Sequence, residues 1–581
     1  MLQRPLAMLS GASLRPSPRQ GGPRSETGGA RPARSADHRW NSTCFRVVAG
    51  LSMACSDPSP WNQGMTIKTT RAALSVAATL FVSQAMAAPF SLEEATVSKI
   101  HDAFRHGTLT CTQLVSGYLA RIDAYNTRGP ALRAILTVNP SALEQARALD
   151  AQYAANPNAA GSLHCIPLIL KDNFDTVDMP TSSGNVAMRD SRPQHDAFTV
   201  AKMRQAGALI LAKSNLQEFA RGGVSISSLG GQVLNPYDLT RNPGGSSGGT
   251  GAAIAANFAV MGTGSDTGQS IRSPSSANNL VGVRPTRGLI SRTGVMPNSF
   301  TQDEIGPIAR TVTDAARLLD VMVGFDKDDP ITALGVGKTP RSYTDGLKAD
   351  ALKGARIGLF TDLMGSDARH AEVSAAMNRV AAEMERRGAT VVRFSLPAYA
   401  TLSKVVATDS FEARPAFDKY FATLPANAPV KSFRQLVDGK TASPDIQKTL
   451  EKEIAIENGM ESDEYKTRML NREKLRIALA GKMAELRIDA ILYPMQSVLV
   501  TKAGDANQPE RNGTLSNGTG FPAVTFQAGF SAPTADAPLG VPIGAELLGL
   551  DYTEPKLLAY AYAFEQATHL RRPPLSTPAL K

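Results

Sequence analysis

The sequence predicts an α/β fold, in which a large sheet is covered by helices on both faces. The segment 198–215 reads as a helix, breaks at Gly207 and continues as an apolar strand, and such helix–strand alternation is typical of layered α/β domains. The segment 397–485 is less apolar and largely helical. We therefore expect one large α/β domain with a helical insertion.

The individual elements follow from hydrophobic periodicity and from start and stop signals. Helices are expected over 91–124, with a break at Gly107 and a capping box of Ser91 and Glu94, over 141–154, over 249–261, and over 311–324 with Thr311 as N-cap. Strands are expected over 165–173, 356–360, 390–394, 489–494 and 541–548.

The N-terminal 87 residues differ in composition from the rest of the chain. Residues 1–64 carry eight arginines and three acids, a net charge of +5, and are rich in Gly, Pro and Ser, so we expect a disordered extension upstream of the true start at Met65. Residues 65–87 combine a charged start, the apolar run 72–82 and Ala85-Met86-Ala87, which is typical of a signal peptide. A genuine arginine-rich leader is the alternative. The remaining 88–581 would form a periplasmic or secreted domain.

Composition excludes several functional classes for that domain. The full chain has 42% hydrophobic and 20% charged residues, as in ordinary globular proteins, and a net charge of +10. Without 1–64, Lys68 and Arg71 the charge falls to +3, which argues against a nucleic-acid partner. No later apolar run has transmembrane length. Cys111 and Cys165 remain, either as a disulfide or as two buried thiols.

Three features of the sequence indicate a catalytic site. Lys171 ends an apolar strand, although position alone would favour a surface lysine. The loop "RNPGGSSGGTG" contains Ser246, and "GSDTGQSIRSP" contains Ser270. Two glycine-rich loops separated by one short helix favour a pocket lined by backbone groups, whereas a single such loop is usually a turn.

These residues resemble the amidase signature family. The chain has "GGSSGG" at 244–249, "GSDTGQSIR" at 264–272, "LILKDN" ending the strand at Lys171, and further similar segments up to "NGTGFPAVTFQAG" at 517–529. The similarity extends from about residue 95 to 573. It implies the amidase signature fold, with a large mixed sheet.

The resemblance also implies a Ser–Ser–Lys triad. Ser270 would be the nucleophile, Ser246, held by a cis peptide, would relay the proton, and Lys171 would be the base. A lysine buried among serines loses its proton more easily, because burial disfavours the charged form, and a neutral lysine can act as a general base.

The loop before the nucleophile would supply the oxyanion hole. Backbone N–H groups of Thr267, Gly268, Gln269 and Ser270 can converge on an oxyanion, which we expect to need the unusual dihedrals that glycine allows. Gln269 stands where the family commonly has glycine, and its side chain is expected to line the acyl pocket; Cys165 is a second departure from glycine. Ser247, Asp266 and Arg272 are expected to give structural support, the last two as an ion pair.

We therefore expect an amidase that cleaves a small-molecule or peptide amide through an acyl-enzyme, with no metal and no cofactor. Homodimer formation is left open. One alternative is an α/β-hydrolase-like esterase, because "GGSSG" fits G-x-S-x-G; it would need a strand before the serine and a histidine such as His569. The others are a non-catalytic secreted binding protein on this scaffold, and the amidase component of a glutamyl-tRNA amidotransferase, against which the signal peptide argues.

Overall fold

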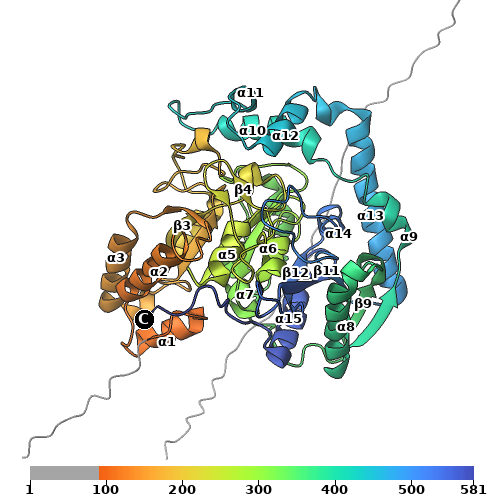
Figure 1. The fold of residues 1–581 in the computed structure, drawn as a ribbon, viewed down its shortest axis with the longest axis horizontal. Helices are drawn as coiled ribbons and strands as arrows, with labels where there is room; N and C mark the ends of the chain where they lie inside the picture. The colour runs from red at the N-terminus through yellow and green to blue at the C-terminus, as the bar shows by residue number, and fades with distance from the viewer. Residues whose placement is uncertain (1–89, 581) are drawn as a thin grey trace, which may run out of the picture. The chain divides into compact units, whose positions relative to one another are not determined.

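The computed structural model describes residues 90–580 (Figure 1). The predicted extension 1–64 and signal peptide 65–87 lie outside these residues. Among the helices described, none combines the length and the apolar character needed to cross a membrane.

A mixed sheet of eleven strands forms the centre of the domain, and this confirms the predicted α/β class. Its spatial order is β1-β3-β2-β6-β8-β7-β12-β13-β11-β9-β10. The strands are β1 (Ile135–Val138), β2 (Pro167–Lys171), β3 (Leu209–Ser214), β6 (Met261–Asp266), β7 (Val281–Arg284), β8 (Glu304–Ala309), β9 (Arg356–Phe360), β10 (Thr390–Phe394), β11 (Ala490–Pro494), β12 (Ala523–Phe530) and β13 (Pro542–Leu548). A separate short hairpin joins β4 (Ile226–Ser227) and β5 (Gly231–Gln232).

Helices cover both faces of this sheet. The helices outside the insertion are α1 (Val97–Arg105), α2 (Cys111–Tyr125), α3 (Ala142–Ala155), α4 (Phe198–Gln205), α5 (Gly248–Ala255), α6 (Arg272–Ala277), α7 (Val312–Met322), α8 (Ala371–Arg386), α14 (Thr514–Asn517) and α15 (Glu554–Thr568). Phe526 of β12 contacts Phe564 of α15. The next residue along, Gln527, pairs with Gly544, where a side chain would collide with Ser276 of α6. Because successive strand residues face opposite sides, α6 and α15 lie on opposite faces.

The first predicted helix is two helices with different caps from those expected. Gly107 adopts a positive φ of 66° and separates α1 from α2, as predicted. The capping box of Ser91 and Glu94 is wrong, because Thr96 caps α1 and accepts from the Lys99 N–H. Glu94 has a positive φ, and its carboxylate instead pairs with Arg571 at 2.8 Å.

The predicted helix over 249–261 is shorter than expected. It ends at Ala255, and Asn257 turns the chain with a φ of 58° so that β6 begins at Met261. The N-cap at Thr311 is confirmed, since its side chain accepts from the Asp314 N–H. The predicted strands at 356–360 and 390–394 match β9 and β10.

The two cysteines of the described domain form a disulfide. Cys111 opens α2 and Cys165 lies just before β2, with their Cα atoms 5.7 Å apart. The bond therefore ties the N-terminal helices to the strand that ends at Lys171. Cys165 has a φ of 53°, the conformation that favours the glycine common in similar sequences.

The helical insertion lies between β10 and β11, as predicted. It contains α9 (Pro397–Leu402), α10 (Asp409–Phe421), α11 (Phe433–Asp438), α12 (Pro444–Ile454) and α13 (Asp463–Leu486). Helices α10, α11 and α12 gather at the top of Figure 1, far from α7 and α15 at the bottom. They share a small core that includes Phe417 and Phe433, and Phe219 and Met296 of the main domain join it.

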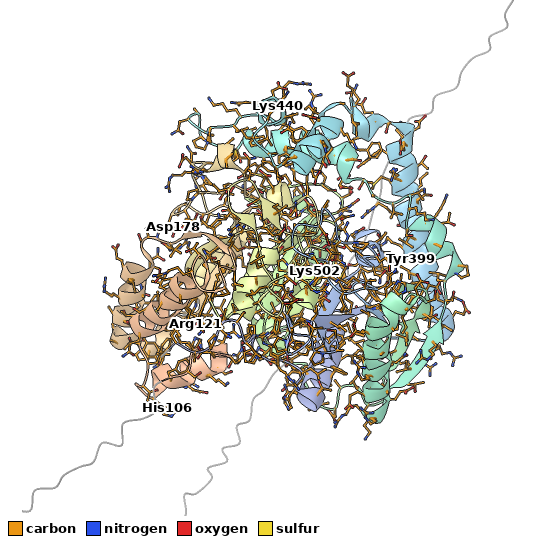
Figure 2. All side chains as sticks on the ribbon, in the orientation of Figure 1. His106, Arg121, Asp178, Tyr399, Lys440 and Lys502 are labelled. Atoms are coloured by element: carbon orange, nitrogen blue, oxygen red, sulfur yellow. A yellow bond between two sulfur atoms is a disulfide. The ribbon has the colours of Figure 1, made fainter. Side chains whose placement is uncertain are left out.

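The C-terminal tail is hydrogen-bonded to the N-terminal helix α2. The buried guanidinium of Arg121 on α2, labelled in Figure 2, donates to the carbonyls of Thr577 at 2.8 Å and Pro578 at 2.9 Å. It also donates to the carbonyls of Ala256 and Asn257, which follow α5. One side chain therefore joins α2, the turn before β6 and the end of the chain.

Candidate active site

Lys171 lies at the carboxyl end of β2, between β3 and β6, and its side chain is completely buried. Its Nζ atom lies 2.7 Å from Ser246 Oγ, 2.8 Å from Ser265 Oγ and 3.3 Å from the Ser265 carbonyl. Three acceptors match the three N–H bonds of an ammonium group. The neutral amine has a lone pair, so that one of the two hydroxyls can donate to it instead.

The surroundings of Lys171 favour the neutral amine. Burial lowers the pKa of Lys171 to about 7, although the more distant carboxylates of Asp266 and Asp303 partly oppose this. No carboxylate among residues 90–580 forms an ion pair with Nζ. Near pH 7 a substantial fraction of this lysine can therefore accept a proton.

Ser246 lies in the tight loop before α5. The Gly245–Ser246 peptide is cis, as the family resemblance implies. The Ser246 carbonyl accepts from the Gln217 N–H at 2.9 Å, and a side chain at Gly245 would come within 2.8 Å of the Gly223 carbonyl carbon. This close packing fixes the Ser246 hydroxyl beside Lys171.

Ser270 lies in the turn between β6 and α6 and is 5% exposed. The Ser247 N–H donates to the Ser270 carbonyl at 3.2 Å, so that the two glycine-rich loops are joined. Lys171 and Ser246 are thus in direct contact, and the loop carrying Ser270 is bonded to the loop carrying Ser246.

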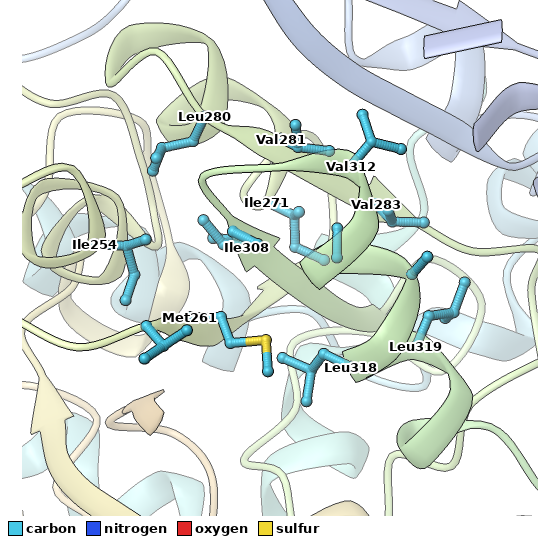
Figure 3. Close-up of a cluster of buried hydrophobic side chains, with 14 of the residues drawn as sticks. Ile254, Met261, Ile271, Leu280, Val281, Val283, Ile308, Val312, Leu318 and Leu319 are labelled. Carbon is cyan, nitrogen blue, oxygen red and sulfur yellow. The ribbon is translucent and has the colours of Figure 1, made fainter. Parts of the chain in front are cut away.

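Ile271, the residue after the candidate nucleophile, anchors this turn in the hydrophobic core. Figure 3 shows it among Ile308, Val281 and Val283, where β6, β7 and β8 meet α6. The Ile271 side chain occupies space left by glycines on these three strands. A Cβ atom at Gly264, Gly282 or Gly306 would come within 2.9, 3.1 or 3.3 Å of it.

The carbonyls of the loop before Ser270 are all held by donors. The Gly268 carbonyl accepts from Arg272 at 2.6 Å and from Asn517 at 2.8 Å, and that of Gln269 accepts from the Ser273 N–H at 2.8 Å. Within the described residues, the N–H groups of Gly268, Gln269 and Ser270 have no hydrogen-bond acceptor. The loop thus leaves donors free for an oxyanion.

The dihedral angles expected for this loop are wrong in one respect. Neither Gly268 nor Gln269 has a positive φ, so a residue with a side chain fits the second position without strain. A Cβ at Gly268 would lie 3.7 Å from its nearest neighbour, Asn517, which is ordinary contact.

Asp266 and Arg272 form the predicted ion pair, at 3.0 Å and fully buried. Arg284 also pairs with Asp266 at 2.9 Å, and Glu546 pairs with Arg272 at 3.2 Å. Burial alone would raise the pKa of Asp266, but the two arginines lower it to about 2. Ser247 Oγ donates to the Ser265 carbonyl at 3.4 Å, beside Lys171. These contacts fix the end of β6, from which the turn to Ser270 starts.

A cavity of about 440 Å³ opens in front of Ser270. Its lining comes from the nucleophile loop, the insertion, α14 with the segment before it, and the loops after β3 and before β8: Ala220–Gly222, Thr267–Ser270, Asn298, Gln302, Ser403, Val406, Ala407, Asp409, Thr449, Glu453, Arg511, Gly513, Thr514 and Asn517. Gln269 lines it, as expected, and the insertion supplies one wall. The other expected residues, Lys171 and Ser246, are not among the lining residues.

Sequence reasoning missed three residues of this site besides Ser265. Arg221 pairs with Glu453 of α12, and both side chains are buried. Arg511 lies beside Gln269. Ser265 lies in the segment "GSDTGQSIRSP", one residue before Asp266. Because successive residues of a strand face opposite sides, its side chain is expected on the face opposite to that of Asp266, and this could have identified it. Arg511 and Glu453 lie in segments without a recognisable motif.

The alternative of an α/β-hydrolase-like esterase fails because neither the required strand nor a histidine lies where that site needs it. Residues 242–247 form a loop, so that no strand runs directly into Ser246. His569 is exposed at the end of α15 and does not line the cavity, and no other described histidine lines it.

The fold and the site define a class of enzyme, the hydrolases that cleave the carbon–nitrogen bond of amides. The Amidase family matches residues 113–558, and the chain belongs to this family. It is thus an enzyme, an amidase.

Three relatives show how far the similarity extends. The chain is 34% identical to the Arabidopsis thaliana protein "Probable amidase At4g34880", over 84% of this chain and 93% of that protein. It is 33% identical to the A component of the glutamyl-tRNA(Gln) amidotransferase of a Synechococcus strain, over 81% and 91%. The crystal structure of peptide amidase from Stenotrophomonas maltophilia superimposes with a TM-score of 0.75 and 34% identity, covering 84% of this chain and 99% of that one.

Proposed function

We propose that this amidase works through a Ser–Ser–Lys triad and an acyl-enzyme. The contact that carries the proposal is the 2.7 Å bond between the buried Lys171 Nζ and Ser246 Oγ. Neutral Lys171 takes a proton from Ser246, which takes one from Ser270. The Ser270 oxygen then bonds to the amide carbon, while N–H groups of the loop Thr267–Ser270 stabilise the oxyanion.

The second half of the reaction returns the protons. The Lys171–Ser246 relay gives a proton to the leaving nitrogen as the carbon–nitrogen bond breaks, and the amine or ammonia departs. Water then attacks the acyl carbon and gives a proton to the same relay. The relay returns that proton to the Ser270 oxygen as the ester carbon–oxygen bond breaks, and the acid product leaves and ionises to the carboxylate in solvent. No metal or organic cofactor takes part in this proposal.

The substrate that we propose is a small-molecule or peptide-like amide. Similarity to a peptide amidase supports this, as does a cavity of about 440 Å³, which is within the size range of sites for such molecules. A panel of aryl anilides, aliphatic amides, peptide amides and esters would identify the preferred class.

A fluorophosphonate probe tests the nucleophile. It should label Ser270 in the wild-type protein and in Ser247→Ala, which is the matched control from the neighbouring loop, and it should not label Ser270→Ala. Peptide mapping by mass spectrometry locates the label. Labelling at Ser247, or labelling that persists in Ser270→Ala, would show that the proposed nucleophile is wrong.

We also propose that the protein is exported. The disulfide between Cys111 and Cys165 supports this, because such bonds persist mainly in oxidising compartments. N-terminal sequencing of exported protein should begin with Ala88-Pro89-Phe90. A mature start upstream of Met65 would contradict both the signal peptide and the start site.

A further inference from the structure

Two arginines line the cavity at Ser270, and only one of them is paired. Arg221 forms an ion pair with Glu453. Arg511 has no ion-pair partner among residues 90–580, and burial lowers its pKa without an opposing carboxylate. Arginine nevertheless keeps its charge in proteins. A cation that is mostly removed from water and unpaired is costly unless a ligand compensates for it.

The position of Arg511 brings this charge close to the catalytic loops. A Cβ at Gly223 would lie 2.5 Å from Arg511 Nη1, so the guanidinium rests against the backbone of Gly223. That backbone in turn packs against Gly245, the residue before Ser246. Only one residue without a side chain therefore separates the cation from the Ser246 loop.

The side chain of Gln269 also fixes the orientation of the Arg511 guanidinium. In the amide orientation that satisfies both groups, its side-chain oxygen accepts from Arg511 Nη1 at 2.7 Å and from Nε at 3.2 Å. Both side chains line the cavity, and their remaining hydrogen-bonding atoms are N–H donors: the other guanidinium N–H groups and the amide NH₂ of Gln269. A cluster of donors with a positive charge matches a planar anion.

We propose that Arg511 and Gln269 form a subsite for a carboxylate, so that preferred substrates carry a carboxylate in addition to the amide that is cleaved. This rests on the proposed function, because it assigns substrate selection in the same cavity. A carboxylate accepts the parallel N–H bonds of a guanidinium with good geometry, and lysine or a neutral side chain cannot reproduce this.

Two matched pairs of anilides test the subsite and locate the carboxylate. The first pair is N-(4-nitrophenyl)succinamic acid and 4-methyl-N-(4-nitrophenyl)pentanamide, which differ only by carboxylate or isopropyl in the acyl part. The second is 4-acetamidobenzoic acid and 4-isopropylacetanilide, which differ in the same way in the amine part. The quantity measured is the acid-to-neutral ratio of kcat/KM, from chromatography of the released amine.

The wild-type enzyme should prefer the acid in one of the two pairs. Arg511→Gln should reduce that ratio roughly 10- to 100-fold, the usual effect of losing hydrogen bonds to a charged group. Gly223→Ala, which displaces Nη1 but keeps the charge, should reduce it in part. Arg147→Gln removes the same charge from an exposed position on α3 and should leave the ratio unchanged.

The outcomes separate this inference from the proposed function. If Arg511→Gln lowers the acid and neutral members equally in both pairs, Arg511 only positions Gln269 and the carboxylate subsite is overturned. If none of the four amides is cleaved, calorimetry with the two acids decides. Binding to Ser270→Ala that is lost in Ser270→Ala/Arg511→Gln supports the subsite without any turnover. Absent binding, or equal binding to both variants, overturns it.

Discussion

Two clusters of polar side chains in the site differ in how completely they are hydrogen-bonded. The sheet-side cluster, which we define as Lys171, Ser246, Asp266 and Arg272, is fully buried outside the cavity lining, and each of its side chains has hydrogen-bond partners. In the cavity-lining cluster, which we define as Arg221, Glu453 and Arg511, the atoms Arg221 Nε and Nη2 and Glu453 Oε2 are buried without a partner among the described residues.

This difference indicates different roles for the two clusters. Buried polar groups in folded proteins are almost always hydrogen-bonded. The sheet-side cluster is fully bonded without a ligand, so its side chains are held in one geometry. The cavity-lining cluster retains hydrogen-bonding capacity that is available to a substrate.

The largest expected difference between the two clusters is in stability. Arg272→Met leaves Glu546 without its ion pair and Asp266 with only Arg284, and breaking such buried pairs costs about 3–5 kcal/mol. Arg511→Met breaks no ion pair and should cost less than about 1 kcal/mol. Urea unfolding of both variants measures this. Equal losses would refute the distinction between the two clusters.

The next effect is on the chemistry. Lys171→Ala removes the proposed general base and should reduce the rate of amide hydrolysis on the order of 10²-fold or more. The loss should be smaller for an activated ester, because its leaving group departs without a proton. The amide-to-ester ratio of kcat/KM in wild type and variant measures the difference. An unchanged ratio with both rates near wild type would make Lys171 a structural residue.

The pH dependence sharpens the role of the same lysine. Burial lowers the pKa of Lys171 to about 7, and the neutral amine is the proposed general base, so kcat/KM should rise about tenfold per pH unit below 7 and level off above it. Ser265→Ala removes an acceptor that stabilises the ammonium form, so the midpoint should move to lower pH. A profile that is flat between pH 6 and pH 9 would contradict the assignment.

The smallest expected effect comes from a pair of glycines at the cavity. A Cβ at Gly513 would lie 2.2 Å from the Gly268 carbonyl oxygen, so Gly513→Ala should destabilise the protein by about 1–3 kcal/mol. Gly268→Ala has room and needs no positive φ, and it should change stability by less than about 1 kcal/mol. Thermal unfolding compares the two. A larger loss for Gly268→Ala would show that the loop is more constrained than these contacts indicate.

The sequence predicted strands β2, β3, β9, β10, β11 and β13 from short, mostly apolar runs. It missed three adjacent strands near the middle of the sheet, β6, β8 and β7. In their segments "MGTGSD", "EIGPIA" and "VGVR", glycine or proline leaves few apolar residues, and both normally weaken a strand. Here Gly264, Gly282 and Gly306 leave space for Ile271, a tertiary reason that no local pattern shows.

The site residues that lie in sequence motifs could be predicted. Lys171, Ser246 and Ser270 were identified from short segments whose spacing resembles a known family. Arg511 and Glu453 were not, because they reach the cavity only through the path of the insertion and of the segment before α14. The position of Gln269 was visible in the sequence, whereas its contact with Arg511 required the fold.

The hydrogen bonds between Arg121 and the C-terminal tail constrain when the domain can be completed during synthesis. Arg121 leaves the ribosome about 450 residues before the carbonyls of Thr577 and Pro578 that it binds. Until those residues emerge, its guanidinium lacks two of its acceptors and keeps those of Ala256 and Asn257. We therefore expect the native domain to be completed only after the whole chain has been released. Such late completion is compatible with the export proposed above.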